Sequence, residues 1–414
     1  MNLMLQRRRI IKAAAGLVGF GSTAGVVNGQ GRGNAGGNQR GNDGLTVESG
    51  ASIQAAIDSA DSGDTIIVEA GTYREQLIIN KDLEIRGREG ATVEAPDEMA
   101  AFTIDESPPQ FEPIVFAYGG SVGDGHVSGS ETVDVSITGL EVDGRDLQPD
   151  VRRKVGVFYR NVRGNGRTAI ENTTVSAMGV GGRETMGILV YGDSDVVIES
   201  NVVRGFERGG IGGNGDGTEH PSPHIVVRNN EVDSNSSPRG WAPNGVQIGY
   251  GASGSVRNNR IQNCRWAVDA DEDWAASAIL LFESDDVQVM GNEVENCDLA
   301  VGVASWGWLL PSASNNTVQG TNVRDVLVGI SIDATASEIS ERDPEVRNNK
   351  VINNEIVNGD PALGATGIEV FTVDTSDDYD PVVSNTKVIR NTINGFDEKV
   401  ADEGTASKVQ AVAF

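Results

Sequence analysis

The amino-acid sequence predicts an all-β fold, a single-stranded parallel β-helix in which short strands stack into a solenoid. The first observation is a repeated aliphatic-x-x-Asn-x-aliphatic pattern, found at Asn201, Asn230, Asn259, Asn292, Asn316, Asn349 and Asn391. The steps between the first six of these residues are 29, 29, 33, 24 and 33, and a period of about 20–50 residues is typical of stacked supersecondary units. The second observation is that a period holds three short apolar runs, such as 244–251, 254–259 and 260–264, which alternate as strands do.

The repeated asparagines have a structural explanation. An asparagine at a sharp corner tolerates the left-handed conformation, and its side chain can bond to backbone groups. In a stack of coils about 4.8 Å apart, the asparagine of each coil can also bond to those above and below. Cys264 and Cys297 each follow a repeat asparagine by five residues, so we expect them on adjacent coils, either as a disulfide or as two buried thiols.

A short helix is predicted before the first coil. Apolar residues recur at helical spacing at Ile53, Ala56, Ile57 and Ala60, and strands begin near Thr65. Because the end of a solenoid exposes unpaired strand edges, this helix is expected to cap the N-terminal end of the stack.

The segment from Ser52 to Gly87, "SIQAAIDSADSGDTIIVEAGTYREQLIINKDLEIRG", resembles the N-terminal segment of the pectin-lyase-like right-handed β-helix superfamily. With the asparagine repeats, the resemblance extends to about Gly395 and implies a right-handed solenoid. The superfamily includes pectin methylesterases, polysaccharide lyases and a periplasmic copper-maturation protein. The sequence lacks the "GDD" and "GHG" motifs of polygalacturonases and the "DFIFG" motif of pectin methylesterases, so the resemblance implies a fold and leaves the reaction open.

The N-terminus resembles a twin-arginine secretion signal, because Arg7 and Arg8 precede a weakly hydrophobic run that is short for a membrane span. We predict a signal peptide over 1–29, a Gly/Asn-rich linker over 30–44, the β-helix domain over 45–395 and a C-terminal tail or cap over 396–414. The mature protein is then expected outside the cell or at its surface, with no membrane span after signal cleavage.

The charge balance of the chain is strongly acidic. It has 60 Asp and Glu residues against 33 Lys and Arg, a formal net charge of −27, and seven lysines. An acidic, lysine-poor and arginine-rich composition resembles the proteins of extreme halophiles. No basic stripe that could neutralise phosphates is evident, so nucleic acid is not expected as a partner.

All five tryptophans lie in insertions around the predicted strands of one region: Trp241, Trp266, Trp274, Trp306 and Trp308. The first three precede the first strand of their coils and the last two follow the equivalent strand, so they would flank one face of neighbouring coils from two sides. Flat aromatic rings beside such a face suit the apolar faces of sugars, which predicts binding of a polysaccharide or cell-surface glycan. The alternative is that these rings cover hydrophobic patches beneath the loops.

The same insertions carry polar residues suited to chemistry. Asp269, Asp271 and Asp273 have the spacing that begins a calcium-binding loop, which predicts calcium as a cofactor. His220 lies on a loop with His224, where a histidine can act in acid–base chemistry or bind a metal.

Two reaction classes remain open if the protein is an enzyme. A lyase needs a base near the α-proton of a uronate, for which His220 or an ionised acid is a candidate. It also needs a cation beside the carboxylate, for which Arg265, Arg239 or calcium is a candidate. An inverting hydrolase needs two carboxyls about 6.5–9.5 Å apart, which the aspartates above and Glu283 could supply. The predicted catalytic residues are therefore His220, Arg265, Asp269 and Asp271.

The alternative to a lyase or hydrolase is a β-helix without catalytic activity, which binds glycan at a cell surface or only builds structure. Metal delivery is disfavoured, because the chain has only three His, six Met and two Cys residues to act as ligands.

Overall fold

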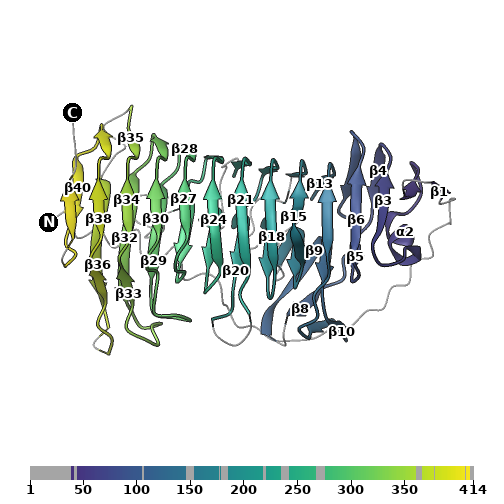
Figure 1. Ribbon diagram of the computed structural model, residues 1–414, viewed down its shortest axis with the longest axis horizontal. Helices are drawn as coiled ribbons and strands as arrows, with labels where there is room; N and C mark the ends of the chain where they lie inside the picture. The colour runs from purple at the N-terminus through teal and green to yellow at the C-terminus, as the bar shows by residue number, and fades with distance from the viewer. Residues whose placement is uncertain are drawn as a thin grey trace.

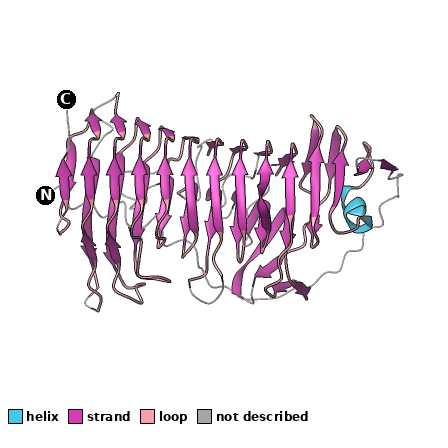
Figure 2. Ribbon diagram, in the orientation of Figure 1, coloured by secondary structure: helices cyan, strands magenta, loops and turns pink. Residues whose placement is uncertain are grey.

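The computed structural model describes residues 39–41 and 44–410, apart from 105–106, 146–152, 177, 179–184, 218–220, 235–241, 267–275, 360–365, 377 and 406. Within these residues the chain is a solenoid of short strands, with β1 (Gln39–Gly41) toward one end and β40 (Glu398–Asp402) at the other (Figure 1). Figure 2 shows strands along the whole stack and a short helix near its N-terminal end. The predicted all-β parallel β-helix is confirmed.

Three long sheets run along the solenoid. Sheet A contains, in spatial order, β1, β2 (Gly44–Val47), β3 (Asp64–Val68), β6 (Leu83–Gly87), β12 (Val135–Thr138), β15 (Arg163–Glu171), β18 (Asp195–Glu199), β21 (His224–Arg228), β24 (Ser253–Arg257), β27 (Gln288–Met290), β30 (Thr317–Gln319), β34 (Lys350–Ile352), β38 (Lys387–Ile389) and β41 (Lys408–Gln410). Sheet B contains β4 (Gly71–Arg74), β7 (Ala91–Glu94), β13 (Glu141–Asp143), β16 (Thr174–Ser176), β19 (Val202–Arg204), β22 (Glu231–Asp233), β25 (Arg260–Gln262), β28 (Glu293–Glu295), β31 (Asn322–Arg324), β35 (Glu355–Val357) and β39 (Thr392–Asn394).

Sheet C is built from longer strands. It contains β10 (Ser121–Gly123), β11 (His126–Ser128), β8 (Phe102–Ile104), β9 (Ser107–Tyr118), β14 (Arg153–Arg160), β17 (Thr185–Tyr191), β20 (Gly209–Asn214), β23 (Asn244–Gly249), β26 (Ser277–Phe282), β29 (Leu299–Ser305), β32 (Val328–Ala336), β36 (Thr366–Asp374) and β40, and β5 (Leu77–Ile79) pairs with β9. A further small sheet joins β33 (Glu345–Arg347) to β37 (Val382–Ser384).

The register keeps like residues above one another from coil to coil. Ile211 of β20 pairs in parallel with Val246 of β23, which pairs with Ile279 of β26. These inward side chains, with those of sheets A and B, form one continuous hydrophobic core along the solenoid. Period-2 alternation therefore sends one set of side chains into the core and leaves the other set on the outer face of each sheet.

The repeat asparagines form buried hydrogen-bond ladders at the corners. Between sheets A and B, Asn230 Oδ1 accepts from the backbone N–H (2.9 Å) and Nδ2 (3.0 Å) of Asn201. Asn230 in turn donates from its backbone N–H (3.0 Å) and Nδ2 (2.9 Å) to Asn259 Oδ1. The left-handed conformation belongs to the preceding residues, such as Asn229 (φ 57°) and Asn258 (φ 52°). Both roles were predicted for one asparagine, whereas the corner divides them between two residues.

The repeat asparagines also occupy two different corners. Asn292 precedes β28 of sheet B, whereas Asn316 precedes β30 of sheet A and donates through its backbone N–H to Asn349 Oδ1 (2.8 Å) in a second ladder. The irregular step of 24 residues marks this change of corner. In the first ladder the place of the missing asparagine is taken by Thr321, and the ladder resumes at Asn354. The buried Oγ1 of Thr321 has no hydrogen-bond partner among the described residues.

Cys264 and Cys297 lie on adjacent coils, which confirms the predicted register. The backbone N–H of Cys264 approaches the Sγ atom of Cys297, with an N···S distance of 3.4 Å. Neither cysteine forms a disulfide with a described residue, and both are buried in the main core. Of the two alternatives, the structure contains the pair of buried thiols.

The predicted capping helix is α2 (Ile53–Ser59). The Ser52 hydroxyl accepts a hydrogen bond from the backbone N–H of Ala55 (3.0 Å), and the Glu75 carboxylate accepts one from the backbone N–H of Ile53 (2.6 Å). These bonds satisfy N–H groups that a helix start leaves without a partner. No helix in the described part of the chain is long and apolar enough to cross a membrane.

The two ends of the solenoid extend beyond the predicted domain limits. At one end β1 pairs antiparallel with β2 inside the segment predicted as a linker. At the other end, beyond Gly395, β40 continues sheet C and β41 continues sheet A. The predicted signal peptide over 1–29 lies outside the described residues.

Candidate functional site

The described part of the chain contains four of the residues predicted to bind or react: Arg265, Trp266, Trp306 and Trp308. The others lie outside the described residues: His220, Trp241, Asp269, Asp271, Asp273 and Trp274. In sequence, the segments that carry these six residues follow β20 or directly precede β23 and β26 of sheet C.

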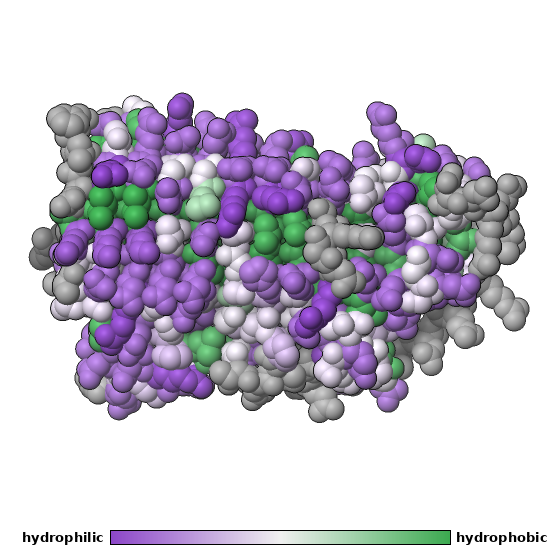
Figure 3. Space-filling view, viewed as in Figure 1, coloured by the Kyte–Doolittle hydropathy of each residue, from purple (hydrophilic) through white to green (hydrophobic). Residues whose placement is uncertain are grey.

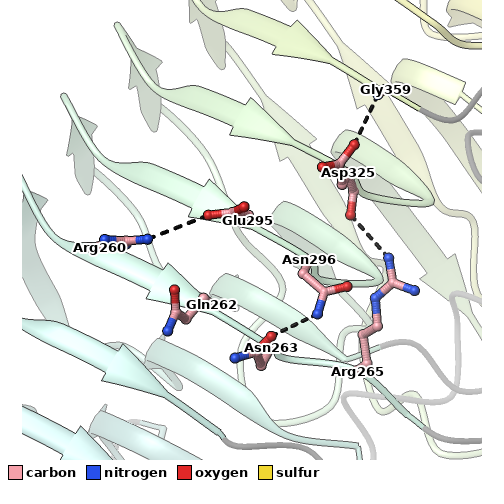
Figure 4. Close-up of a pocket in the computed structure, with 8 residues that line it drawn as sticks. All are labelled: Arg260, Gln262, Asn263, Arg265, Glu295, Asn296, Asp325 and Gly359. Atoms are coloured by element: carbon pink, nitrogen blue, oxygen red, sulfur yellow. Dashed lines mark hydrogen bonds and ion pairs between the residues drawn. The ribbon is translucent and has the colours of Figure 1, made fainter.

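A polar hollow of about 660 Å³ lies beside β25, β28 and β31 of sheet B (Figure 4). It is lined by Arg260, Gln262, Asn263, Arg265, Glu295, Asn296, Asp325 and Gly359. A neighbouring hollow of about 300 Å³ shares two of these residues, Arg260 and Glu295. The structure therefore places the predicted residue Arg265 in a cavity with several polar side chains that the sequence analysis did not select.

The floor of this hollow follows from the corner where the chain leaves sheet B. Asn263, Asn296 and Asp325 hold left-handed φ angles of 61°, 55° and 53°, which Asn and Asp adopt more readily than other non-glycine residues. Asn296 Nδ2 donates to Asn263 Oδ1 (2.7 Å), and Asn263 Nδ2 donates to Asp233 Oδ1 (2.8 Å). This chain of bonds holds the amide groups in fixed orientations.

The charged groups of the hollow balance one another. Arg260 Nη2 lies 3.6 Å from Glu295 Oε2, and both side chains are exposed. Arg265 Nη2 donates to the backbone oxygen of Asp325 (3.0 Å), and Asp325 Oδ1 accepts from the backbone N–H of Gly359 (2.9 Å). Among the described residues, the lining has two guanidinium groups and two carboxylates, so this part of the hollow offers hydrogen bonds rather than a net charge, as the hydroxyl groups of a sugar require.

The described tryptophans pack against the protein to different degrees. Trp306 is 4% exposed, and its ring centroid lies 5.8 Å from that of Phe282. Trp308 is partly buried, with its ring centroid 5.9 Å from that of Tyr250 in an edge-on arrangement. Trp266 is partly buried against the main core. The ring of Trp306 is therefore closed to a ligand. For this residue, the alternative prediction of a ring that covers a hydrophobic patch is the one that fits.

Glu283 anchors the loop that carries the last two tryptophans. Its carboxylate accepts hydrogen bonds from the backbone N–H groups of Trp308 (2.7 Å), Leu309 (2.9 Å) and Leu310 (2.9 Å). Burial raises the pKa of Glu283 above its usual value, although these backbone hydrogen bonds oppose the shift. Because both oxygens are engaged in holding the loop, Glu283 does not fit the role of a hydrolytic carboxyl that the sequence analysis considered.

The outer face of sheet C carries a row of buried amides. Asn244 Nδ2 donates to Gln247 Oε1 (3.0 Å), and Gln247 Nε2 donates to Asn214 Oδ1 (3.1 Å). Beside them Gly212 leaves a depression of about 20 Å³, which Arg208 also lines. A space of this volume holds about one water molecule, so in this structure the row is closed to a sugar.

A buried carboxyl pair lies further along the same face. Ser331 of β32 pairs in register with Glu369 of β36, and Asp333 follows on the same side of β32. Asp333 and Glu369 are only 4% and 6% exposed. Burial and then the charge of Glu369 raise the pKa of Asp333 to about 8, against the opposing effect of a hydrogen bond from Thr335 Oγ1 to Asp333 Oδ2 (3.3 Å). Asp333 therefore holds its proton at neutral pH, as a general acid must.

Asp333 and Glu369 were not among the residues predicted from the sequence, although a signal was present. Both acids interrupt the apolar runs of long strands, "GISIDATA" and "GIEVF", at positions that alternate with buried residues. An ionisable residue inside such a run is a candidate functional group, because its burial is costly unless it is used or neutralised.

No group of three or more His, Cys, Asp or Glu side chains that could hold a metal ion occurs among the described residues. The predicted calcium ligands Asp269, Asp271 and Asp273 lie outside those residues, so calcium binding stays a prediction.

Comparison with known proteins concerns the fold. A family model described as the right handed beta helix region matches residues 155–395. No curated protein sequence matches the chain. A family 28 exopolygalacturonase from Yersinia enterocolitica is structurally similar, with a TM-score of 0.55 and 13% identity, over 87% of this chain and 75% of that chain. The A-module of a mannuronan C-5 epimerase from Azotobacter vinelandii covers 87% of this chain and 95% of that chain, with a TM-score of 0.46 and 16% identity. At 13% identity, the similarity to the exopolygalacturonase indicates a shared fold and no more.

Proposed function

Because the chain belongs to the right-handed β-helix family, we propose that it binds polysaccharide and that the hollow beside β25, β28 and β31 is a contact site for the sugar chain. The main support for this proposal is the volume of the hollow, about 660 Å³, together with the guanidinium and amide groups that line it. Binding sites for small ligands are of this size and hold a few oriented polar groups. The solenoid supports the proposal, since its coils offer an extended surface to an extended polymer.

The binding proposal predicts that Arg260→Gln/Arg265→Gln lowers the affinity for oligosaccharide by about tenfold or more, because two charged hydrogen-bond donors are lost. Isothermal titration calorimetry with pectate, alginate and hyaluronan oligosaccharides measures the effect. Arg204→Gln/Arg228→Gln is the matched control, since it removes two ion-paired arginines outside the hollow. Equal affinities of the hollow variant and the control for every glycan that binds would contradict the assignment of the site.

Cleavage of the glycan is a second candidate function, and the buried pair of Asp333 and Glu369 favours it. A protonated carboxyl next to a second carboxyl is the arrangement that acid-catalysed cleavage of a glycosidic bond uses. The outer face of sheet C would then be the reaction site, and opening of the face would have to precede entry of the substrate, because both side chains are buried.

If this pair catalyses cleavage, Asp333→Asn should lower the rate by roughly 100-fold or more, because general acid catalysis contributes about that much. New reducing ends and the absorbance of unsaturated uronates, followed together, distinguish a hydrolase from a lyase. Asp374→Asn, which changes an exposed acid on β36, serves as the control. Undiminished cleavage by the Asp333 variant would exclude the pair, and a wild-type protein that binds without cleaving would leave binding as the function.

Our proposal for location and cofactor follows the sequence. Export by the twin-arginine pathway, a position outside the cell or at its surface, and adaptation to high salt rest on residues 1–29 and on the net charge of −27. Calcium at Asp269, Asp271 and Asp273 rests on their spacing.

A further inference from the structure

The outer face of sheet A changes character along the solenoid. Toward the N-terminus, acidic side chains alternate with the buried residues of β6 and β18, at Glu84, Asp195 and Glu199, whereas the outward residues of β21 and β24 are histidine, valine, serine and arginine. The outward residues of β27, β30, β34, β38 and the start of β41, which we name the sheet A strip, are glutamine, methionine, threonine, lysine and isoleucine. None of them is acidic, although the chain has 60 acidic residues. The strip is therefore a local exception to the charge of the whole protein.

Three of the seven lysines of the chain stack in one column of this strip. Lys350 pairs in register with Lys387, and Lys387 pairs with Lys408, on consecutive coils. Stacked coils repeat at about 4.8 Å, and like charges placed directly opposite one another destabilise a sheet. None of the three side chains forms an ion pair or a hydrogen bond with the rest of the chain as described. The fold holds three positive charges together and leaves them for an external anion.

Two other columns flank the lysines. On one side, Ile352 and Ile389 face outward in register and are half-buried. On the other side, at the corner where the chain enters sheet A, Asn385 Nδ2 donates to Asn348 Oδ1 (2.6 Å), and Asn348 Nδ2 donates to Asn315 Oδ1 (3.3 Å). Figure 3 shows this surface as a hydrophobic patch over β34 and β38 with a hydrophilic band beneath it. Across the strip, the chain thus presents amide, cationic and apolar columns side by side.

We propose that the sheet A strip binds a linear polysaccharide whose sugars carry carboxylates. The lysine ammonium groups pair with the carboxylates, the exposed amides bond with hydroxyls, and the isoleucine side chains cover apolar faces of the sugar rings. Because the strands are parallel and in register, the columns run along the solenoid axis, and an extended polymer meets one lysine on each coil. This inference rests on the proposed binding of polysaccharide and assigns the selection of an acidic polymer to the strip, since the described lining of the hollow on sheet B is charge-balanced.

The chemistry of the flanking columns favours a uronic-acid polymer over a phosphate surface. Amides and isoleucines beside the lysines suit a chain with hydroxyl groups and apolar ring faces, whereas an anionic membrane surface offers no single chain to follow the columns. The strip is not apparent from the sequence, because residues 350, 387 and 408 are far apart in the chain and become neighbours only through the strand register.

The test compares binding of the full chain to polymannuronate of defined length, at low and at molar KCl. Lys350→Gln/Lys387→Gln/Lys408→Gln should bind about tenfold more weakly than wild type and lose most of the salt dependence of binding. The matched control Arg86→Gln/Arg88→Gln/Lys399→Gln removes three exposed positive charges elsewhere and should bind within about twofold of wild type. Thermal unfolding checks that both variants are folded.

Each other outcome overturns the proposal. Equal losses in the strip variant and the control would mean that overall charge alone attracts the polymer. Unchanged binding in the strip variant, with a loss in Arg260→Gln/Arg265→Gln, would place the acidic polymer in the hollow on sheet B. Binding of anionic lipid vesicles or single-stranded DNA in preference to polymannuronate would show that the strip has a different partner. Loss of polymannuronate binding in the strip variant alone supports the strip as the binding site, whether or not the hollow binds sugar.

Discussion

Asn259→Ala is expected to lower the free energy of unfolding by about 4 kcal/mol. The Asn259 side chain makes four hydrogen bonds in the buried ladder between sheets A and B. Its Oδ1 accepts from the backbone N–H and Nδ2 of Asn230, and its Nδ2 donates to Val227 O (3.0 Å) and Asn292 Oδ1 (3.0 Å). Alanine removes these bonds and leaves the partner groups buried. The cost of such unsatisfied groups exceeds the net gain from making the bonds, because they are not returned to water.

Chemical denaturation followed by circular dichroism measures this loss. Asn322→Ala is the matched control, because Asn322 lies on β31 of the adjoining sheet B, is exposed and forms no side-chain hydrogen bond within the described part of the chain. We expect its effect to stay within about 0.5 kcal/mol. A solenoid can unfold in parts, since each coil contacts mainly its neighbours, so loss of structure near β25 before the rest is compatible with the prediction. A change of less than about 1 kcal/mol for Asn259→Ala would contradict a stabilising ladder.

The fold was predictable because the residues that form its corners and core repeat at regular intervals in the sequence. The spacing of Asn201, Asn230 and Asn259 reports the length of a coil, and the equal offsets of Cys264 and Cys297 report the register. The spacing could not show which corner an asparagine occupies, since at either corner a side chain that bonds to backbone groups is stabilising. The ladder of Asn316 and Asn349 on a second corner therefore looked like a continuation of the first.

The candidate sites were less predictable, because they depend on residues that only the register brings together. Arg265 was selected from its place beside an insertion, and the structure lines a hollow with it. Its neighbours Glu295 and Asp325 come from the next two coils and have no distinguishing local pattern. The same holds for Asp333 and Glu369, which are neighbours only because β32 pairs with β36.

Asp333→Asn is expected to make the protein more stable than wild type in alkaline solution, by up to about 6 kcal/mol. Burial, followed by the charge of Glu369, raises the pKa of Asp333 from 3.8 to about 8. In the folded protein this group keeps its proton over a pH range in which the unfolded chain releases it. The stability linked to that proton is fully present below about pH 4 and is lost as the pH rises through about 8.

The size of the effect follows from the pKa difference, since one unit corresponds to about 1.4 kcal/mol. Asparagine is uncharged throughout, so the variant avoids the burial of an ionised Asp333 next to Glu369. Urea unfolding at a series of pH values between about 4 and 9 should give a falling profile for wild type and a flatter one for the variant. Asp374→Asn should keep the wild-type slope, because its carboxylate is exposed at the end of β36. Parallel profiles for wild type and Asp333→Asn would mean that Asp333 ionises in the folded protein as it does in the unfolded chain, and the buried pair could not then supply a general acid at neutral pH.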